Sequence, residues 1–143
     1  QHSVDYFHRK LGKLMWENCG MSRSEKQLNE ALQQIPQLRE QFWQELKVTG
    51  SNNMLNAELE KAGRVADYLE FAEVVCRDAL ERKESCGAHF REEYQSSSGE
   101  AQRDDKHYSY TSAWEYQGNK EQPLLHKEKL NHDEVMPTSR SYK

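Results

Sequence analysis

Apolar side chains recur every three or four residues near the start of the chain, a spacing that predicts an amphipathic helix over residues 4–19. Ser3 precedes this helix as a candidate N-terminal cap, and Gly20 follows it as a stop. Asp5 lies in the first turn, where a negative charge favours the helix dipole. The predicted buried stripe consists of Val4, Phe7, Leu11, Leu14 and Met15.

The same spacing predicts a second helix over residues 24–47, with a capping box formed by Ser22 and Glu25. Pro36 interrupts this stretch, and proline disturbs a helix because it lacks a backbone donor. The apolar stripe keeps its phase across Pro36, which favours one kinked helix, although Pro36 could instead begin a new helix. The stripe consists of Leu28, Ala31, Leu32, Ile35, Leu38, Phe42 and Leu46.

A turn over residues 49–53, in which Asn52 and Asn53 are natural caps, separates the second helix from a third helix over residues 54–83. Three amphipathic helices joined by short turns predict an antiparallel bundle. Small residues at Ala62, Gly63 and Ala66 would allow close helix packing. The inward stripe is expected to contain Leu55, Leu59, Ala62, Ala66, Leu69, Ala72, Cys76, Ala79 and Leu80.

The pattern changes after Glu84, where the helical stripe ends and residues 84–106 are expected to form a loop. Alternating side chains then predict a β-strand over residues 107–116 and a returning strand over residues 124–130, with Gly118 and Asn119 between them. A lone hairpin is marginally stable in water, so its aromatic face should pack on the bundle or on another chain. That face carries Tyr108, Tyr110, Ser112, Trp114 and Tyr116.

These elements predict a mainly α fold: an antiparallel three-helix bundle with the up-down-up order of a spectrin repeat, then a loop, a β-hairpin and an irregular C-terminal tail from His132. We expect the bundle to occupy residues 1–86. We expect residues 87–143 to pack on it as part of the same structural unit.

Composition narrows the class of protein. The 143 residues include 35% hydrophobic and 31% charged side chains, with a mean hydropathy of -1.11 and a net charge of -4. No apolar run is long enough to span a membrane, and no segment is basic enough to indicate nucleic-acid binding. Three cysteines without a CxxC pair suggest a reducing compartment. Because the first residue is Gln1, we expect the chain to start within a longer protein.

Candidate chemistry is sparse. No Gly-rich phosphate loop occurs, and none of the six histidines has the spacing of a metal site. Cys86 and His89 are near each other, but such a pair in a loop is weak support for a nucleophilic site, and Cys76 is expected in the core. The acidic residues of the third helix alternate with basic ones, as on a solvent-exposed face. We therefore expect no catalytic, cofactor-binding or metal-binding residue in this chain.

One polar segment stands apart, the stretch from Glu84 to Tyr94, which follows the third helix directly. It combines a glycine with small neighbours and then with histidine, arginine and acidic residues. These features predict an interface with another domain, with side chains that are exposed or paired locally within the chain itself. The predicted interface residues are Gly87, His89, Arg91, Glu92 and Tyr94. The alternative interpretation is a helix end followed by an ordinary charged loop.

This segment also carries a resemblance to a known family. Residues 64–70, residues 79–94 and the Arg-Asp-Asp run at residues 103–105 resemble, in order, the C-terminal domain of the flavoprotein subunit of succinate dehydrogenase and fumarate reductase. The family pattern is approximately E-S-R-G-A-H-x-R-x-D-[YF], then R-D-D, and its chains often end in Arg-x-Tyr, as in residues 140–142. Gly87, His89 and Arg91 match. Cys86 replaces the family's usual arginine, and Glu93 its usual aspartate, so no role of that arginine can be transferred.

The resemblance implies a parent subunit that holds FAD covalently, interconverts succinate and fumarate, and passes electrons to an iron–sulfur subunit. The residues that bind FAD and the dicarboxylate belong to the family's FAD and capping domains, so this chain itself would hold no cofactor. The implied partners are those two domains of the same chain, the iron–sulfur subunit and a membrane anchor, with no nucleic acid. The implied location is the cytoplasmic side of the inner membrane, bound peripherally.

Two alternatives stay open. The C-terminal bundle of L-aspartate oxidase is similar, although aspartate oxidases usually end before a hairpin and tail of this kind. A free-standing helical interaction module would also carry a polar loop and an aromatic hairpin. The sequence preceding Gln1 discriminates the interaction module from the flavoproteins, because only a flavoprotein would have a flavin-binding domain there.

Overall fold

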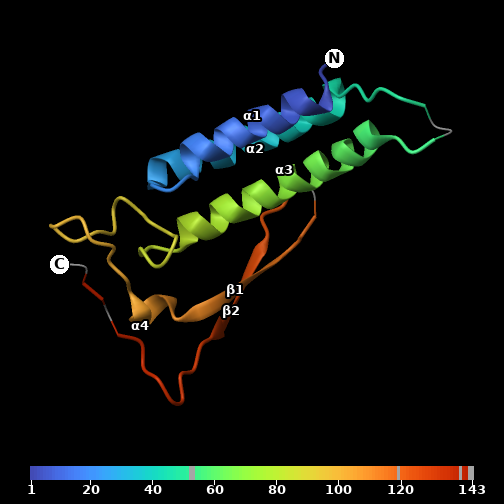
Figure 1. Cartoon of the computed structure of the whole chain (residues 1–143). Helices are drawn as coiled ribbons and strands as arrows, with labels where there is room; N and C mark the ends of the chain where they lie inside the picture. The colour runs from blue at the N-terminus through green and yellow to red at the C-terminus, as the bar shows by residue number, and fades with distance from the viewer. Residues whose placement is uncertain (52–53, 119, 139, 142–143) are drawn as a thin grey trace.

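The computed structural model describes residues 1–51, 54–118, 120–138 and 140–141. Three long helices, α1 (Val4–Asn18), α2 (Glu25–Glu45) and α3 (Ala57–Glu81), pack as an antiparallel bundle (Figure 1). A short helix, α4 (Asp105–Tyr108), precedes a hairpin of β1 (Tyr110–Glu115) and β2 (Leu124–Lys129). The predicted mainly α fold with a hairpin is therefore confirmed. The expectations for Asn52, Asn53, Asn119 and Tyr142 lie outside the described residues.

The first helix begins and ends where the sequence predicts. The Ser3 hydroxyl accepts a hydrogen bond from the amide of Tyr6 at 3.3 Å and so caps α1. At the other end, a Cβ on Gly20 would lie only 2.5 Å from the carbonyl oxygen of Trp16. Glycine is therefore the residue that this turn requires.

The predicted capping box of the second helix is wrong. Ser24, not Ser22, caps α2: its hydroxyl accepts from the amide of Gln27 at 3.3 Å. Arg23 is held in extended pairing with the segment around Arg91, so the chain turns into the helix only at residue 24. Pro36 lies inside a single helix, which confirms the prediction that the helix is continuous.

The third helix is shorter than predicted. Asn56 caps it, its side-chain oxygen accepting from the amides of Glu58 and Leu59 at 3.1 Å. Leu55 precedes the helix and is 98% exposed, and Leu59 is 58% exposed, so both are wrongly assigned to the core. The residue on the buried face one turn before Ala62 is Glu58 rather than Leu59. The buried stripe consists of Ala62, Val65, Leu69, Ala72, Cys76 and Ala79.

The core lies between the three long helices and contains the predicted stripes, apart from Leu55 and Leu59. Phe7 of α1 and Phe42 of α2 meet edge to face, with ring centroids 5.3 Å apart. Cys76 is fully buried, as predicted, and its thiol lies 3.7 Å from the sulfur of Met15. Burial of this cluster removes apolar surface from water, which is the main stabilising term for such a fold.

The hairpin begins later than predicted, because Tyr108 belongs to α4, whose first turn is capped by Asp104. The strands pair antiparallel, with Tyr110 opposite Lys129 and Trp114 opposite Leu125. Tyr110, Ser112 and Trp114 share the more buried face, as the alternation predicts. Tyr116 lies beyond β1 and is exposed.

Two side-chain contacts hold the hairpin against α3. The indole of Trp114 donates to Asp78 at 3.0 Å, and the ammonium of Lys127 lies 3.0 Å from Glu81. Figure 1 shows the hairpin on the side of α3 away from α1 and α2. No helix among the described residues is long and apolar enough to cross a membrane.

Candidate functional site

The segment from Glu84 to Tyr94 closes one end of the bundle, where α3 ends and α2 begins. Its backbone pairs with the residue that precedes the α2 cap: the amide of Arg23 donates to Phe90 at 3.1 Å, and the amide of Glu92 donates to Arg23 at 2.8 Å. The segment is thereby fixed to two helices that are distant in sequence. It is an ordered part of the fold rather than a free loop.

Arg91 is the most buried charged residue of this segment, with 1% of its surface exposed. Its guanidinium donates to the carbonyl oxygens of Ala79 and Leu80, at 3.0 and 3.1 Å, in the last turn of α3. A cation at this end complements both the free carbonyls and the helix dipole. The expectation that Arg91 is exposed or only locally paired is therefore wrong, because the helix end is itself its partner.

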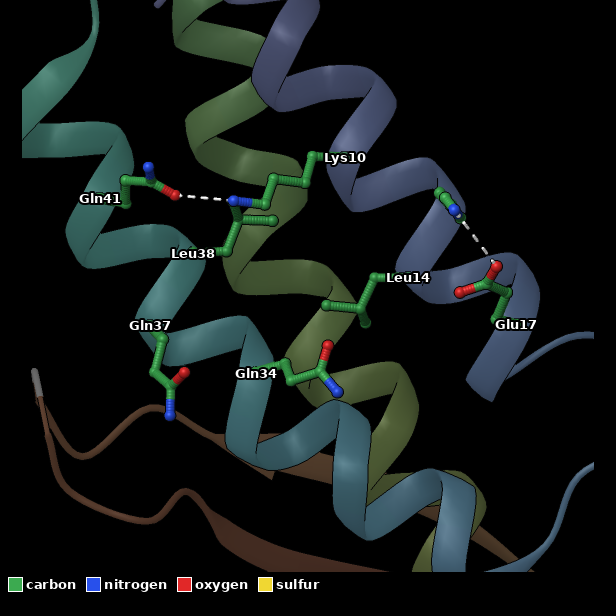
Figure 2. A pocket seen from close by; sticks show the side chains of 8 residues that line it. Lys10, Leu14, Glu17, Gln34, Gln37, Leu38 and Gln41 are labelled. Atoms are coloured by element: carbon green, nitrogen blue, oxygen red, sulfur yellow. Dashed lines mark hydrogen bonds and ion pairs between the residues drawn. The ribbon is translucent and has the colours of Figure 1, made fainter. Parts of the chain in front are cut away.

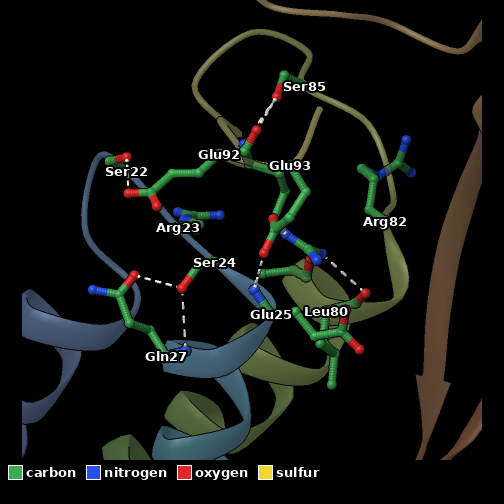
Figure 3. Close-up of polar contacts among 12 residues, drawn as sticks. Ser22, Arg23, Ser24, Glu25, Gln27, Leu80, Arg82, Ser85, Glu92 and Glu93 are labelled. Atoms are coloured by element: carbon green, nitrogen blue, oxygen red, sulfur yellow. Dashed lines mark hydrogen bonds and ion pairs between the residues drawn. The ribbon is translucent and has the colours of Figure 1, made fainter. Parts of the chain in front are cut away.

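Glu93 links Arg91 to the other helix. One carboxylate oxygen lies 3.1 Å from Nε of Arg91, and the other accepts from the amide of Glu25 at 2.6 Å (Figure 3). Burial alone would raise the pKa of Glu93, but the hydrogen bonds from backbone amides and from Arg91 outweigh it and lower the pKa. The pair thus connects the negative end of α3 to the positive end of α2.

Two buried polar residues hold the start of the segment. The hydroxyl of Ser85 accepts from the amide of Arg91 at 2.9 Å and donates to its carbonyl at 3.1 Å. The carboxylate of Glu84, which is 3% exposed, accepts from Arg82 at 2.9 Å and from the amide of Asp104 at 2.8 Å. Both side chains have partners, so their burial is not costly.

His89 bridges two arginines. Its Nδ1 lies 3.0 Å from a guanidinium nitrogen of Arg23, which can only donate, so Nδ1 accepts and the proton is on Nε2. Nε2–H donates to the carbonyl of Arg82 at 2.9 Å. Burial, then the positive charges of Arg23, Arg91 and Arg82, lower the pKa of His89 despite that carbonyl. The imidazole is therefore neutral, with both nitrogens engaged.

Cys86 and His89 close a tight turn through two backbone hydrogen bonds, of 2.8 and 3.1 Å. Gly87 adopts a φ of 60° at its tip, a conformation that favours glycine. The tip is exposed, and so is the thiol-bearing residue Cys86. Because both nitrogens of His89 are bonded elsewhere, this imidazole is not placed to activate the thiol.

The predicted interface residues thus separate into three groups. Gly87 and Glu92 are exposed, Glu92 accepting from the Ser22 hydroxyl at 2.8 Å. His89 and Tyr94 are half-buried, and Arg91 is buried with its guanidinium 5.3 Å from the ring centroid of Tyr94. Their use as an interface stays a prediction. Arg91 is buried, so it can contribute only by holding the segment in place.

Arg23 and Arg82 are site residues that the sequence does not reveal. Arg82 donates to the carbonyls of Tyr108 and Tyr110, at 3.0 and 3.3 Å, and so ties the segment to the hairpin. Its position two residues before Glu84, within the stretch that resembles the family, is a weak signal. Arg23 has no such signal, because it is brought to the segment only by the packing of α2 against α3.

The charged side chains of this surface are engaged with one another and with helix ends. Glu84 and Glu93 are paired with arginines, and no group of histidine, cysteine or acidic side chains among the described residues could hold a metal ion. A groove of about 280 Å³ between α1 and α2 is lined by lysine, glutamine and glutamate side chains and by Leu14 and Leu38, and in it Lys10 donates to Gln41 at 2.9 Å (Figure 2). Neither place arranges a nucleophile beside a free base.

A family model and several curated proteins match this chain. The family described as fumarate reductase flavoprotein C-term matches residues 8–142. The chain is 29% identical over 99 residues to the fumarate reductase flavoprotein subunit of Haemophilus influenzae, covering 69% of this chain and 15% of that protein. It is 28% identical over 101 residues to the L-aspartate oxidase of Synechocystis, covering 62% of this chain and 18% of that protein.

The fold has a counterpart in a solved structure. Escherichia coli quinol fumarate reductase matches with a TM-score of 0.80 and 22% sequence identity, covering 96% of this chain and 23% of that chain. The described chain therefore spans less than a quarter of each of the three proteins compared. The match extends over both the bundle and the hairpin.

Proposed function

The chain belongs to the family of fumarate reductase flavoprotein C-terminal domains, and we propose that it serves as the C-terminal domain of a subunit that interconverts succinate and fumarate. The proposal rests on the motif from Glu84 to Tyr94 lying within a family match over residues 8–142. In this proposal electrons pass from the flavin of that subunit to an iron–sulfur subunit. The complex is peripheral to the cytoplasmic side of the inner membrane, where a membrane anchor holds it.

The family implies FAD, but the cofactor does not fit the residues of this chain. A dinucleotide is usually held by a Gly-rich turn whose helix offers free amides to the pyrophosphate. The three long helices are capped by Ser3, Ser24 and Asn56, whose side chains accept hydrogen bonds from first-turn amides. Those amides are therefore not available to a pyrophosphate. We therefore assign FAD, and the dicarboxylate, to the FAD and capping domains of the same subunit.

The role left to this chain is to form a rigid surface for those domains. Arg91, Glu93 and Ser85 fix the motif segment to the ends of α2 and α3, so its exposed tip at Gly87 is held in one position. A preorganised surface loses less conformational entropy when it binds. Cys86 lies on this tip, where the family commonly has arginine, and it offers a partner no charge.

L-aspartate oxidase is the second candidate, because one such enzyme matches 62% of the chain. The family match runs to residue 142 and so includes the hairpin and tail, which favours the fumarate reductase interpretation. The full-length subunit should be assayed for flavin-dependent dye reduction with succinate and with L-aspartate as alternative substrates. The proposal predicts turnover with succinate; turnover with L-aspartate alone, or no bound flavin, would overturn it.

A further inference from the structure

A cleft of about 590 Å³ lies between α3 and the hairpin, outside the core of the bundle. Phe71, Val74 and Val75 of α3 line one side, and Tyr110 and Trp114 of β1 line the other. The hydrogen bond from Trp114 to Asp78 fixes the separation of the two sides. The cleft is therefore present before anything binds in it.

The apolar wall of this cleft is partly uncovered. Phe71 is 66% exposed, although the helix around it packs against two other helices and the hairpin. Its neighbours Val74 and Val75 are half-buried. Covering such side chains with an apolar partner is favourable, in proportion to the area removed from water.

At the opposite end of the cleft lies Arg23, whose guanidinium has no carboxylate partner in the described part of the chain, while the carboxylate that lines the cleft, Asp78, accepts the hydrogen bond from Trp114. Arg23 donates to the carbonyl of Gly20 and to His89, each at 3.0 Å, and forms no ion pair among the described residues. Arg82 and Arg91, by contrast, are paired with Glu84 and Glu93. A half-buried guanidinium in this state favours an acidic partner.

The neutral state of His89 supports the same conclusion. Burial, and after it the positive charges of three arginines, lower its pKa. His89 therefore carries no charge at neutral pH, and the positive field at this end of the cleft comes from the arginines. A carboxylate entering beside Arg23 would be stabilised by that field.

We propose that this cleft receives an acidic side chain, flanked by apolar ones, from the FAD or capping domain of the same subunit. The carboxylate pairs with Arg23, and the apolar side chains cover Phe71. This rests on the proposed function. The turn formed by Cys86 and His89 lines the same cleft, so the motif segment and Arg23 belong to one docking surface.

Covalent linkage favours a partner from the same polypeptide. The matched part of the chain corresponds to 15% of the Haemophilus influenzae relative. In a subunit of that size, the rest of the polypeptide is several times larger than this domain and is tethered to it. A tethered segment has an effective concentration in the millimolar range, without any cost of bimolecular association. A second copy of the chain, or the iron–sulfur subunit, has no such advantage.

Hydroxyl-radical footprinting of the full-length subunit tests the cleft directly. Phe71 and Trp43 are similarly exposed in this chain, at 66% and 69%, so Trp43 is an internal control. The proposal predicts that Phe71 is labelled several-fold more slowly than Trp43 in the isolated subunit, once each rate is divided by the intrinsic reactivity of its ring. Equal labelling of Phe71, protection that disappears on dilution, or protection that requires the iron–sulfur subunit would each overturn it.

Charge reversal tests the assigned partner. Arg23→Glu should restore labelling of Phe71 and increase proteolysis between the domains, whereas Arg23→Lys should keep the protection and Arg9→Glu on the outer face of α1 should change neither. Because Arg23→Glu could disturb folding, Phe71→Asp with Trp43→Asp as its control gives a second comparison. If Arg23→Glu and Phe71→Asp both show the proteolysis of the unmutated subunit, the docking proposal is wrong but the proposed function is not affected. If the unmutated subunit holds no flavin, the proposed function itself is wrong.

Discussion

Arg91 and Glu93 connect two helices through ends of opposite polarity. Arg91 donates to the last carbonyls of α3, while Glu93, 3.1 Å from the Nε of Arg91, accepts from the first-turn amide of Glu25 in α2. Each charge lies where the helix dipole favours it. The family motif therefore contributes to the bundle itself as well as to the surface it presents.

Arg91→Ala should destabilise the chain by about 3 kcal/mol, because it leaves buried carbonyls without a donor and a cavity in place of a fully buried side chain. Arg64 is a matched control, since its ion pair with Glu60 is exposed. Arg64→Ala should leave the unfolding free energy nearly unchanged, because water and salt screen an exposed ion pair. Urea denaturation measures both changes, and equal costs would mean that Arg91 is not part of the packed structure.

The phase of α3 can be tested with one substitution at two leucines. Leu69 is fully buried and Leu59 is 58% exposed. Leu69→Ala should cost about 2–5 kcal/mol, as core truncations do. Leu59→Ala should stay within about 0.5 kcal/mol. Chemical denaturation that ranks the two variants in reverse would show that the buried stripe of α3 is misplaced.

Stability should depend on pH through His89. Burial and the neighbouring arginines hold its folded-state pKa below the ordinary value of about 6.5. The unfolded chain then binds more protons below that value, so the contribution of His89 is complete above it and is lost as the pH falls through the folded-state pKa. His89→Gln should reduce the loss of stability between about pH 7 and about pH 5.

The exposed His8 provides the control for that measurement. His8→Gln should leave the pH dependence of the unfolding free energy unchanged. If the two variants lose the same stability on acidification as the unmodified chain, His89 is not the group responsible. The neutral tautomer assigned from its two hydrogen bonds would then need revision.

Local sequence features predicted the helices well, because their caps and stripes depend on nearby residues. Residue type at the helix ends predicts Ser3 and Gly20, and spacing predicts the buried face through Leu69. The cap at Ser24 was missed because pairing of Arg23 with a segment far along the chain delays the start of α2. Leu59 was misplaced because a stripe extended by one turn can shift to the adjacent face.

The candidate site was only partly predictable. The motif identified the segment from Glu84 to Tyr94, but it did not show that Arg91 is buried, since a charged residue after a helix is usually exposed. Arg91 caps the end of α3 by donating to Ala79, twelve residues earlier in the chain, and this contact depends on how the segment folds back. Arg23 could not be found from sequence, because its cleft is made by three separate elements.

The isolated 143-residue chain, compared with the full-length subunit, tests the central claim most directly. Both should be purified in parallel, and their flavin absorbance and succinate-dependent reduction of a dye measured. We predict a colourless and inactive chain beside a yellow, active subunit, because the chain supports the flavoprotein without holding its cofactor. Flavin bound to the isolated chain, or a full-length protein that holds none, would contradict this account.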